Sequence, residues 1–118
     1  IYDKISLSKL YMNEINLLKR KVREFSEERD WTKFHNPKDL AIALVLEASE
    51  VLEPFRFKSH FDNSELAKEL ADVLNILLRL ADVLDIDLIH WFDQKMAENR
   101  EKYPIEKFYG VNLKYSEI

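Results

Sequence analysis

Two pairs of acidic residues are spaced so that they could act together. Glu47 and Glu50 lie three residues apart in the stretch VLEASEVLEPF, and Glu69 and Asp72 lie three residues apart in ELAD. Residues three apart on a helix share one face, so each pair would present its carboxylates side by side. The segment 40–46 has no polar residue, and ionised carboxylates in such an apolar setting are costly unless a cation meets them. The first pair therefore predicts a cation site.

The chemistry of this site depends on whether the two pairs converge. If the two helices pack antiparallel, four carboxylates lie close together and repel one another strongly. Such a cluster is tolerated when some carboxylates keep their protons or when divalent cations neutralise them. An all-oxygen ligand set suits Mg²⁺ or Mn²⁺ better than Zn²⁺, and Mg²⁺ commonly shares its coordination shell with substrate phosphates. The pattern is typical of phosphoryl or nucleotidyl substitution.

Two other interpretations of the carboxylates remain open. The polar residues of the second acidic segment fall on one helical stripe, which could simply face water. A di-iron or di-manganese bundle is the other alternative, but it needs Glu-x-x-His on two helices, and no Glu of this chain has a His three residues later. The residues of the polar stripe are Glu65, Lys68, Asp72, Asn75, Arg79 and Asp82.

Long helices are needed to position these carboxylates, and the spacing of apolar residues predicts four. Asn36 followed by Pro37 is a typical helix start, and Pro54 would end the same helix. Short connections between amphipathic helices favour antiparallel neighbours, and hence a helical bundle. The predicted helices are approximately 6–28, 37–53, 64–84 and 85 or 87 to 102, followed by an irregular tail, 105–118.

The composition fits a single globular domain over residues 1–118. Hydrophobic residues make up 47% of the chain and charged residues 34%, which is unlike a disordered chain. One Gly and three Pro are too few turn-forming residues for a many-stranded β fold. The absence of Cys excludes disulfides, thiolate metal sites and a Cys nucleophile. We therefore expect an all-α domain.

Charge and hydropathy limit the possible partners. A net charge of −4 argues against binding of polymeric nucleic acid, although not against a small phosphate ligand that arrives with a divalent cation. No stretch approaches the roughly 18 apolar residues of a membrane span, and no signal-peptide pattern is present. We expect a cytoplasmic protein that does not bind membranes.

Four motifs, in order and at compatible spacing, resemble the dCTP pyrophosphatases of the MazG-like, all-α nucleoside triphosphate pyrophosphatase superfamily. They are ERDWTKFHNPKDLAIALVLEASEVLE, ELAKELADVLNILLRLAD, KMAENREKYP and LKYSE, and the resemblance covers residues 25–117. It implies a four-helix bundle whose core and active site are completed by homo-oligomerisation, as a dimer or tetramer. It also implies Mg²⁺-dependent hydrolysis of a (deoxy)nucleoside triphosphate to the monophosphate and pyrophosphate, with Mn²⁺ as a possible substitute.

The resemblance also implies roles for individual residues. The metal-binding ExxE…ExxD pattern matches Glu47, Glu50, Glu69 and Asp72. Of these, Glu50 or Glu47 would hold or deprotonate the attacking water, and the sequence does not say which. The residues matched to substrate binding are Trp31, His35, Phe57, Lys95, Asn99, Arg100, Lys102, Lys114 and Tyr115.

Each substrate-binding assignment has a structural alternative. Trp31 and Phe57 could pack in the core instead of stacking on a base, and His35 could make only a structural hydrogen bond. Lys95 and Asn99 share a helix face, but basic residues at a helix C-terminus are also ordinary. Lys114 and Tyr115 could belong to a frayed end.

The base preference stays open in the sequence. Phe57 stands where relatives often have Trp, and Ile76 where relatives close to dCTP pyrophosphatase have an aromatic. We expect dCTP or a modified dCTP as substrate in nucleotide-pool house-cleaning. A related pyrophosphatase that prefers dUTP or another nucleotide, and a non-catalytic helical interaction module, are the alternatives.

Overall fold

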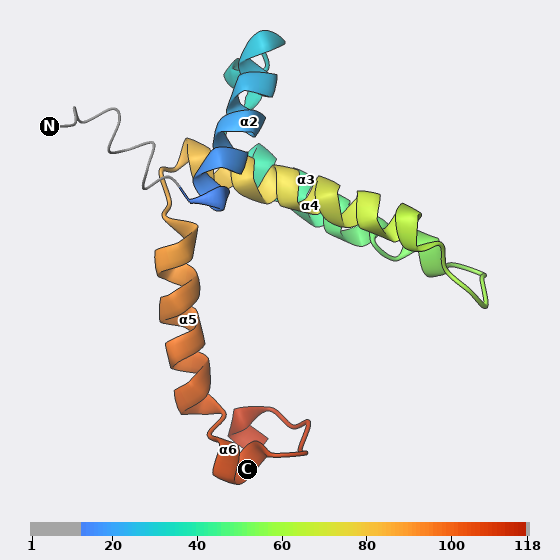
Figure 1. Cartoon of the computed structure of the whole chain (residues 1–118), viewed down its shortest axis with the longest axis vertical. Coiled ribbons are helices and arrows are strands. Elements are labelled where there is room, and N and C mark those ends of the chain that lie inside the picture. Colours follow the sequence, from blue (N-terminus) through green and yellow to red (C-terminus); the bar gives the residue numbers. More distant parts are fainter. Residues whose placement is uncertain (1–12, 118) are drawn as a thin grey trace, which may run out of the picture. The chain divides into compact units, whose positions relative to one another are not determined.

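The computed structural model describes residues 13–117, and all the regular structure in that part is helical (Figure 1). This confirms the predicted all-α class. The start of the first predicted helix, residues 6–12, lies outside the described residues. No helix within 13–117 is both long and apolar enough to cross a bilayer. The α-helices are α2 (Glu14–Glu28), α3 (Pro37–Glu50), α4 (Asn63–Val83), α5 (Leu88–Lys102) and α6 (Ile105–Phe108).

Side-chain caps fix where the four longer helices begin. Asn13, Asn36, Asp62 and Asp87 each accept a hydrogen bond from a backbone N–H of the first helical turn. Such a cap stabilises a helix by about 1 kcal/mol. On α3 the cap is followed at once by Pro37, whose missing N–H is not needed at the first helical position.

Helix α3 is shorter than predicted, because it ends at Glu50 and not near Glu53. Pro54 cannot donate a hydrogen bond to the carbonyl of Glu50, and its ring would clash with that carbonyl. The chain instead forms a short 3-10 turn, Glu53–Phe55. The prediction placed the stop at the proline itself, although a proline ends the helix up to four residues earlier.

Helices α2 and α4 end in the same way, with an aspartate in the left-handed region. Asp30 has φ 56° and Asp85 has φ 53°. In each case the next residue donates its N–H back to a carbonyl five residues earlier: Trp31 to Ser26 at 2.9 Å, and Ile86 to Ala81 at 2.8 Å. This is the Schellman arrangement, which satisfies the last carbonyls of a helix and turns the chain away.

The main packing unit contains α2, α3 and α4. Helices α3 and α4 lie side by side and run in opposite directions, with their connection at one end of the pair, and α2 packs on α4 (Figure 1). The apolar residues buried in the described part are Leu40, Leu78 and Ala81. This is a small core for a chain of 118 residues, so large apolar side chains remain exposed.

The chain divides into two compact units, one ending at Ile86 and the other covering Asp87–Ile118. The second unit contains α5, α6 and a short 3-10 turn, Tyr115–Glu117. The tail, for which irregular structure is predicted, thus contains two short helical segments. Tyr103 holds them to the end of α5, with its ring 4.9 Å from Phe108 and 5.9 Å from Tyr115.

Candidate functional site

Three of the four predicted metal ligands lie together. Glu47 and Glu50 stand in the last turn of α3, and Glu69 stands in the second turn of α4. One carboxylate oxygen from each lies within 4.8 Å of those of the other two. Asp72, one turn after Glu69, is outside this group of three, but its negative charge acts on both Glu47 and Glu69. The antiparallel packing of α3 on α4 is what brings the two acidic pairs together.

The carboxylates of this cluster destabilise one another. Burial raises the pKa of Glu47, and the charges of Glu50 and Asp72 raise it further. Burial likewise raises the pKa of Glu69, again with contributions from Glu50 and Asp72. One oxygen on each of Glu47 and Glu69 is buried without a hydrogen-bond partner in the described part of the chain. A buried acceptor without a partner is costly, so the cluster is arranged for something that supplies positive charge.

A small divalent cation fits this donor set. Mg²⁺ binds oxygen at about 2.1 Å, so its ligands lie no more than about 4.2 Å apart. The three carboxylate oxygens lie within 4.8 Å of one another, and a shift of less than about 1 Å would close them on such an ion. The unpaired oxygens of Glu47 and Glu69 are the acceptors that an oxygen-preferring ion uses. Glu47, Glu50 and Glu69 could therefore hold Mg²⁺ or Mn²⁺.

Trp31 is fixed by the end of α2. Its backbone N–H closes the Schellman arrangement on Ser26. Its ring packs edge-on against Phe25, with ring centroids 5.8 Å apart, and the guanidinium of Arg29 lies over the Phe25 ring at 3.6 Å. Trp31 still has 46% of its surface exposed. The predicted base-stacking residue is thus held firmly but is not buried in the core.

Phe57 has an unusual backbone conformation and a highly exposed side chain. Its φ is 56°, a left-handed conformation that is unusual for a bulky residue, and 94% of its surface is exposed. Strain of this kind costs of order 1 kcal/mol or more and concentrates at functional sites. The Phe57 ring is met by the guanidinium of Arg56 at 5.0 Å. The core-packing alternative is therefore wrong for Phe57.

Trp31 and Phe57 do not face each other within one chain. Trp31 and His35 precede α3, whereas Phe57 and the carboxylates of α3 lie at its other end. Helix α3 has 14 residues, which at 1.5 Å per residue separates its ends by about 21 Å. A base sandwiched between these two aromatic residues would need Phe57 from one chain and Trp31 from another.

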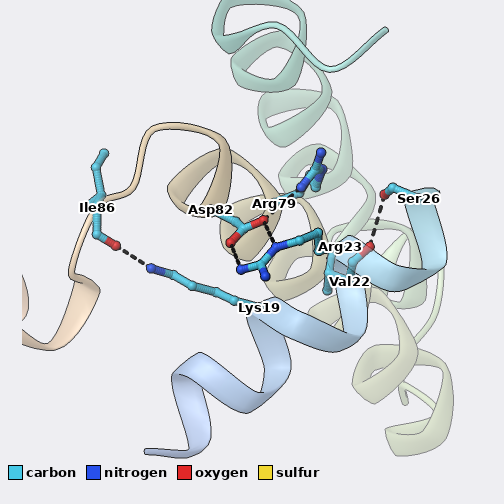
Figure 2. Close-up of polar contacts among 7 residues, drawn as sticks. All are labelled: Lys19, Val22, Arg23, Ser26, Arg79, Asp82 and Ile86. Carbon is cyan, nitrogen blue, oxygen red and sulfur yellow. Dashed lines mark hydrogen bonds and ion pairs between the residues drawn. The ribbon is translucent and has the colours of Figure 1, made fainter. Parts of the chain in front are cut away.

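Sequence reasoning missed a buried charged network behind His35. Arg79 and Asp82 belong to the stripe that could have faced water, but Arg79 is only 4% exposed, so that alternative is wrong for this end of the stripe. Asp82 accepts hydrogen bonds from Arg79 and from Arg23 of α2, as Figure 2 shows. Arg79 also donates to His35 Nδ1 at 2.9 Å. The sequence signal that could have revealed this network was the i, i+3 spacing of Arg79 and Asp82 beside the apolar residues Leu78 and Ala81.

The remaining substrate-binding candidates belong to the second unit. Lys95 and Asn99 lie one turn apart on α5, where Lys95 Nζ is 3.1 Å from a Glu98 oxygen. Lys102 Nζ lies 5.2 Å from the centre of the Tyr115 ring, and the N–H of Lys114 donates to Glu117. The tail is therefore bonded within itself and to the end of α5. The predicted substrate-binding roles of these residues and of Arg100 stay predictions.

Known proteins resemble this chain along most of its length. The model of the MazG-like family matches residues 42–118. The dCTP pyrophosphatase 1 proteins of Rattus norvegicus and Homo sapiens are each 36% identical over 111 residues, which cover 86% of this chain. The chain spans only 65% of the length of these relatives.

A solved structure extends the similarity to the fold. The crystal structure of a pyrophosphatase from Archaeoglobus fulgidus has a TM-score of 0.71 and 36% sequence identity to this chain. The match covers 80% of this chain and 95% of that one. Both the helical fold and the acidic segments of α3 and α4 fall within a single known family. The chain belongs to the MazG-like family.

Proposed function

We propose that this protein is a Mg²⁺-dependent hydrolase that converts a nucleoside triphosphate, with dCTP as the first candidate, to the monophosphate and pyrophosphate. The observation that carries the proposal is the convergence of Glu47, Glu50 and Glu69, with one buried, unpaired oxygen on each of Glu47 and Glu69. The names of the dCTP pyrophosphatase 1 relatives and of the Archaeoglobus fulgidus pyrophosphatase support the reaction class. A cytoplasmic location stays a prediction.

The reaction adds one water to the α-phosphorus. The water oxygen forms a new bond to that phosphorus, the bond to the bridging oxygen breaks, and pyrophosphate leaves. Bound Mg²⁺, or Mn²⁺ in its place, would supply positive charge to the triphosphate and make a water molecule more acidic. Glu50 or Glu47 would orient the attacking water and take its proton. Lys95, with Arg100 and Lys102, would supply positive charge to the phosphates, and Asn99 a polar contact.

A second copy of the chain would complete the site. Trp31 and His35 lie at one end of α3, whereas Phe57 and the carboxylates lie at the other, so a single chain does not place Trp31 and Phe57 on the same base. The middle of α3 also exposes an apolar groove lined by Lys38, Ala41, Ile42, Val45 and Leu46. Val45 is 68% exposed and Leu46 is 60% exposed, which is unfavourable unless another surface covers them. We therefore propose a homo-oligomer, as a dimer or tetramer, in which α3 of one copy packs against another.

The base preference needs a direct measurement. Aromatic side chains such as Trp31 and Phe57 stack on any base and discriminate weakly. We expect dCTP or a modified dCTP to give the highest kcat/KM, and dUTP or another nucleotide triphosphate is the alternative. A panel of nucleotides with pyrophosphate detection separates these substrates.

The primary test compares the wild type with Glu50→Gln. We expect pyrophosphate release by the wild type with Mg²⁺, weaker or equal release with Mn²⁺, and none with EDTA. Glu50→Gln should lose the activity while keeping its helical circular dichroism and its oligomeric state, and Glu24→Gln on the exposed face of α2 should keep the activity. A wild type that hydrolyses no nucleotide with either ion would favour the non-catalytic interaction module.

Mixing two inactive variants tests the shared site. Glu50→Gln removes the carboxylate half and Trp31→Ala the aromatic half, so each variant alone should be nearly inactive. In a mixed two-fold dimer one of the two sites receives both intact halves, and random exchange should restore about a quarter of the wild-type activity. No restoration, with exchange verified by mass spectrometry, would show that each copy builds its site alone.

A further inference from the structure

His35 has an arginine as its hydrogen-bond partner inside the protein. Arg79 Nε donates to His35 Nδ1 at 2.9 Å, across 44 residues of sequence. Arginine has only donors, so His35 Nδ1 must carry a lone pair and not a proton. The imidazole is therefore neutral, and its single proton is on Nε2.

The arginine that imposes this tautomer is itself held rigidly. Arg79 is 4% exposed, and its Nη1 donates to Asp82 Oδ2 at 2.9 Å. Asp82 is held from the other side by Arg23, whose Nε donates to the same oxygen at 2.9 Å and whose Nη2 contacts the second oxygen, as Figure 2 shows. The planar guanidinium of Arg79 has little freedom to rotate, so the His35 ring is fixed through it.

Separate hydrogen bonds fix the ends of the helices whose residues surround this network. Lys19 of α2 donates to the carbonyl of Ile86, the residue that closes the end of α4. Asn36, directly after His35, caps α3 by accepting from the N–H of Asp39 at 2.9 Å. His35 thus lies where hydrogen bonds hold α2, α3 and α4 in place, so its position is more strongly restrained than that of a residue in an ordinary surface loop.

We propose that Arg79, held by Asp82 and Arg23, is a positioning residue that keeps His35 as the neutral Nε2–H tautomer, and that this Nε2–H donates a hydrogen bond to an acceptor atom of the bound nucleotide. The inference rests on the proposed function, because it assumes a nucleotide at the site. The acceptor is an oxygen or nitrogen of the base, or a phosphate oxygen. A permanently charged Arg79 beside the ring disfavours an imidazolium, so His35 acts as a neutral donor and not as a cation.

The tautomer can be read in the unmodified protein. Long-range ¹H–¹⁵N spectra distinguish a protonated from an unprotonated ring nitrogen, and comparison with His35→Gln assigns the His35 signals among the three histidines. We expect an unprotonated Nδ1 and a protonated Nε2 at pH 7. A protonated Nδ1, or a charged ring at that pH, would overturn the inference without reference to activity.

A matched pair of variants tests the link to the nucleotide. Arg79→Met removes the donor to His35, while Asp82 keeps its two contacts with Arg23; Arg79→Gln retains an N–H donor without the charge. We expect Arg79→Met to raise KM about fivefold to tenfold with little change in kcat, as for loss of one hydrogen bond, and Arg79→Gln to recover most of this loss. The double variant with His35→Ala should be no worse than His35→Ala alone.

A purely structural role predicts a different result. Both Arg79 variants would then lower the melting temperature while KM stayed at its wild-type value, which would refute the inference. If Arg79→Met does not fold, His35→Ala decides the same question, because an unchanged KM in that variant also refutes it. A wild type without turnover would refute the proposed function and the nucleotide part of this inference, whereas the tautomer spectrum would still decide the rest.

Product inhibition shows which part of the nucleotide carries the acceptor. If His35 contacts the base or the α-phosphate, His35→Ala should weaken inhibition by the nucleoside monophosphate and leave inhibition by pyrophosphate unchanged. If it contacts the β- or γ-phosphate, pyrophosphate inhibition should weaken instead. Loss of neither would place His35 outside the nucleotide site and overturn the assignment.

Discussion

Replacement of Glu47 by glutamine should make the metal-free protein more stable and the enzyme inactive. Burial and the charges of Glu50 and Asp72 raise the pKa of Glu47. Glutamine keeps the shape, removes the charge and can donate a hydrogen bond to the Glu50 carboxylate. The variant therefore loses a repulsion that the native side chain retains, and with it one predicted ligand of the metal.

The size of the effect follows from the geometry. Carboxylate oxygens of Glu47 and Glu50 lie within 4.8 Å, and two charges at that separation repel by about 1 kcal/mol when water screens them, as it does beside the exposed Glu50. For a chain of this size this corresponds to about 4 °C in melting temperature. We expect Glu47→Gln without metal to melt about 4 °C above the wild type.

Magnesium should reverse this order. At ten times its dissociation constant, a bound ion adds about 1.4 kcal/mol, or about 6 °C, to the wild type. Glu47→Gln should gain little from the ion, and its pyrophosphate release should fall to background. Differential scanning fluorimetry at fixed protein concentration, with EDTA or with Mg²⁺, measures both effects, and Glu24→Gln on the exposed face of α2 is the control.

The pH dependence of stability independently checks whether Glu47→Gln is more stable than the metal-free wild type. Because the folded protein raises the pKa of Glu47 above its usual value of 4.5, the metal-free wild type loses stability as pH rises through the raised pKa. Below about pH 4.5 both states bind the proton, and the advantage of the glutamine variant should disappear. Two results would refute the idea that a metal ion relieves repulsion among these carboxylates. One is a metal-free Glu47→Gln that melts below the wild type at pH 7, and the other is a Glu47→Gln whose melting temperature rises with Mg²⁺ as much as that of the wild type.

Three further changes test other parts of the structure. Arg23 lowers the pKa of Asp82 below its usual 3.8, so the stability that Asp82 contributes is present above about pH 4 and is lost as pH falls through the lowered pKa. Asp82→Asn should therefore lower the free energy of unfolding by about 2–3 kcal/mol at pH 7, measured by urea unfolding. An equal loss at pH 2.5 would contradict this. Phe57→Asn, which tolerates a positive φ, should leave the melting temperature unchanged or higher while raising KM, and a lower melting temperature with unchanged KM would show that Phe57 is structural. Asn36→Ala should destabilise the protein by about 1 kcal/mol through loss of the α3 cap, and no change in the unfolding midpoint would contradict that role.

Sequence signals predicted the helix ends well where an end depends only on neighbouring residues. Asn36 and Pro37 start α3 as predicted, because a cap and a proline at the first position depend only on neighbouring residues. Asp30 and Asp85, which end α2 and α4 in the left-handed region, were not predicted, since glycine is the usual residue there. The single glycine of this chain, Gly110, lies in the tail instead.

The carboxylate cluster was predictable because charge in an apolar segment is a strong signal. Glu47 and Glu50 follow a segment without polar residues, and the structure brings Glu69 of α4 to them. The contact between His35 and Arg79 gave no comparable signal, because it joins residues 44 positions apart and depends on how α2, α3 and α4 pack. The same sequence stripe holds exposed Asp72 and buried Arg79, and only the packing separates them.

The length of α3 separates the two halves of the proposed site within one chain, and a second copy could bring them together. Its ends are about 21 Å apart, with His35 and Trp31 at one and Glu47, Glu50 and Phe57 at the other. A two-fold axis perpendicular to α3 and passing beside its middle would set two copies of the helix antiparallel and in contact, because such an axis reverses the helix direction. Each aromatic end would then lie beside the carboxylate end of the other copy.

The exposed surface around the middle of α3 suits such a contact. Ala41 is small and exposed, so it would let a second helix approach closely. Ile42, Val45 and Leu46 are all at least half exposed and line the same groove, so they would supply the apolar area that the contact buries. One contact could thus cover the exposed apolar surface and also complete the catalytic site.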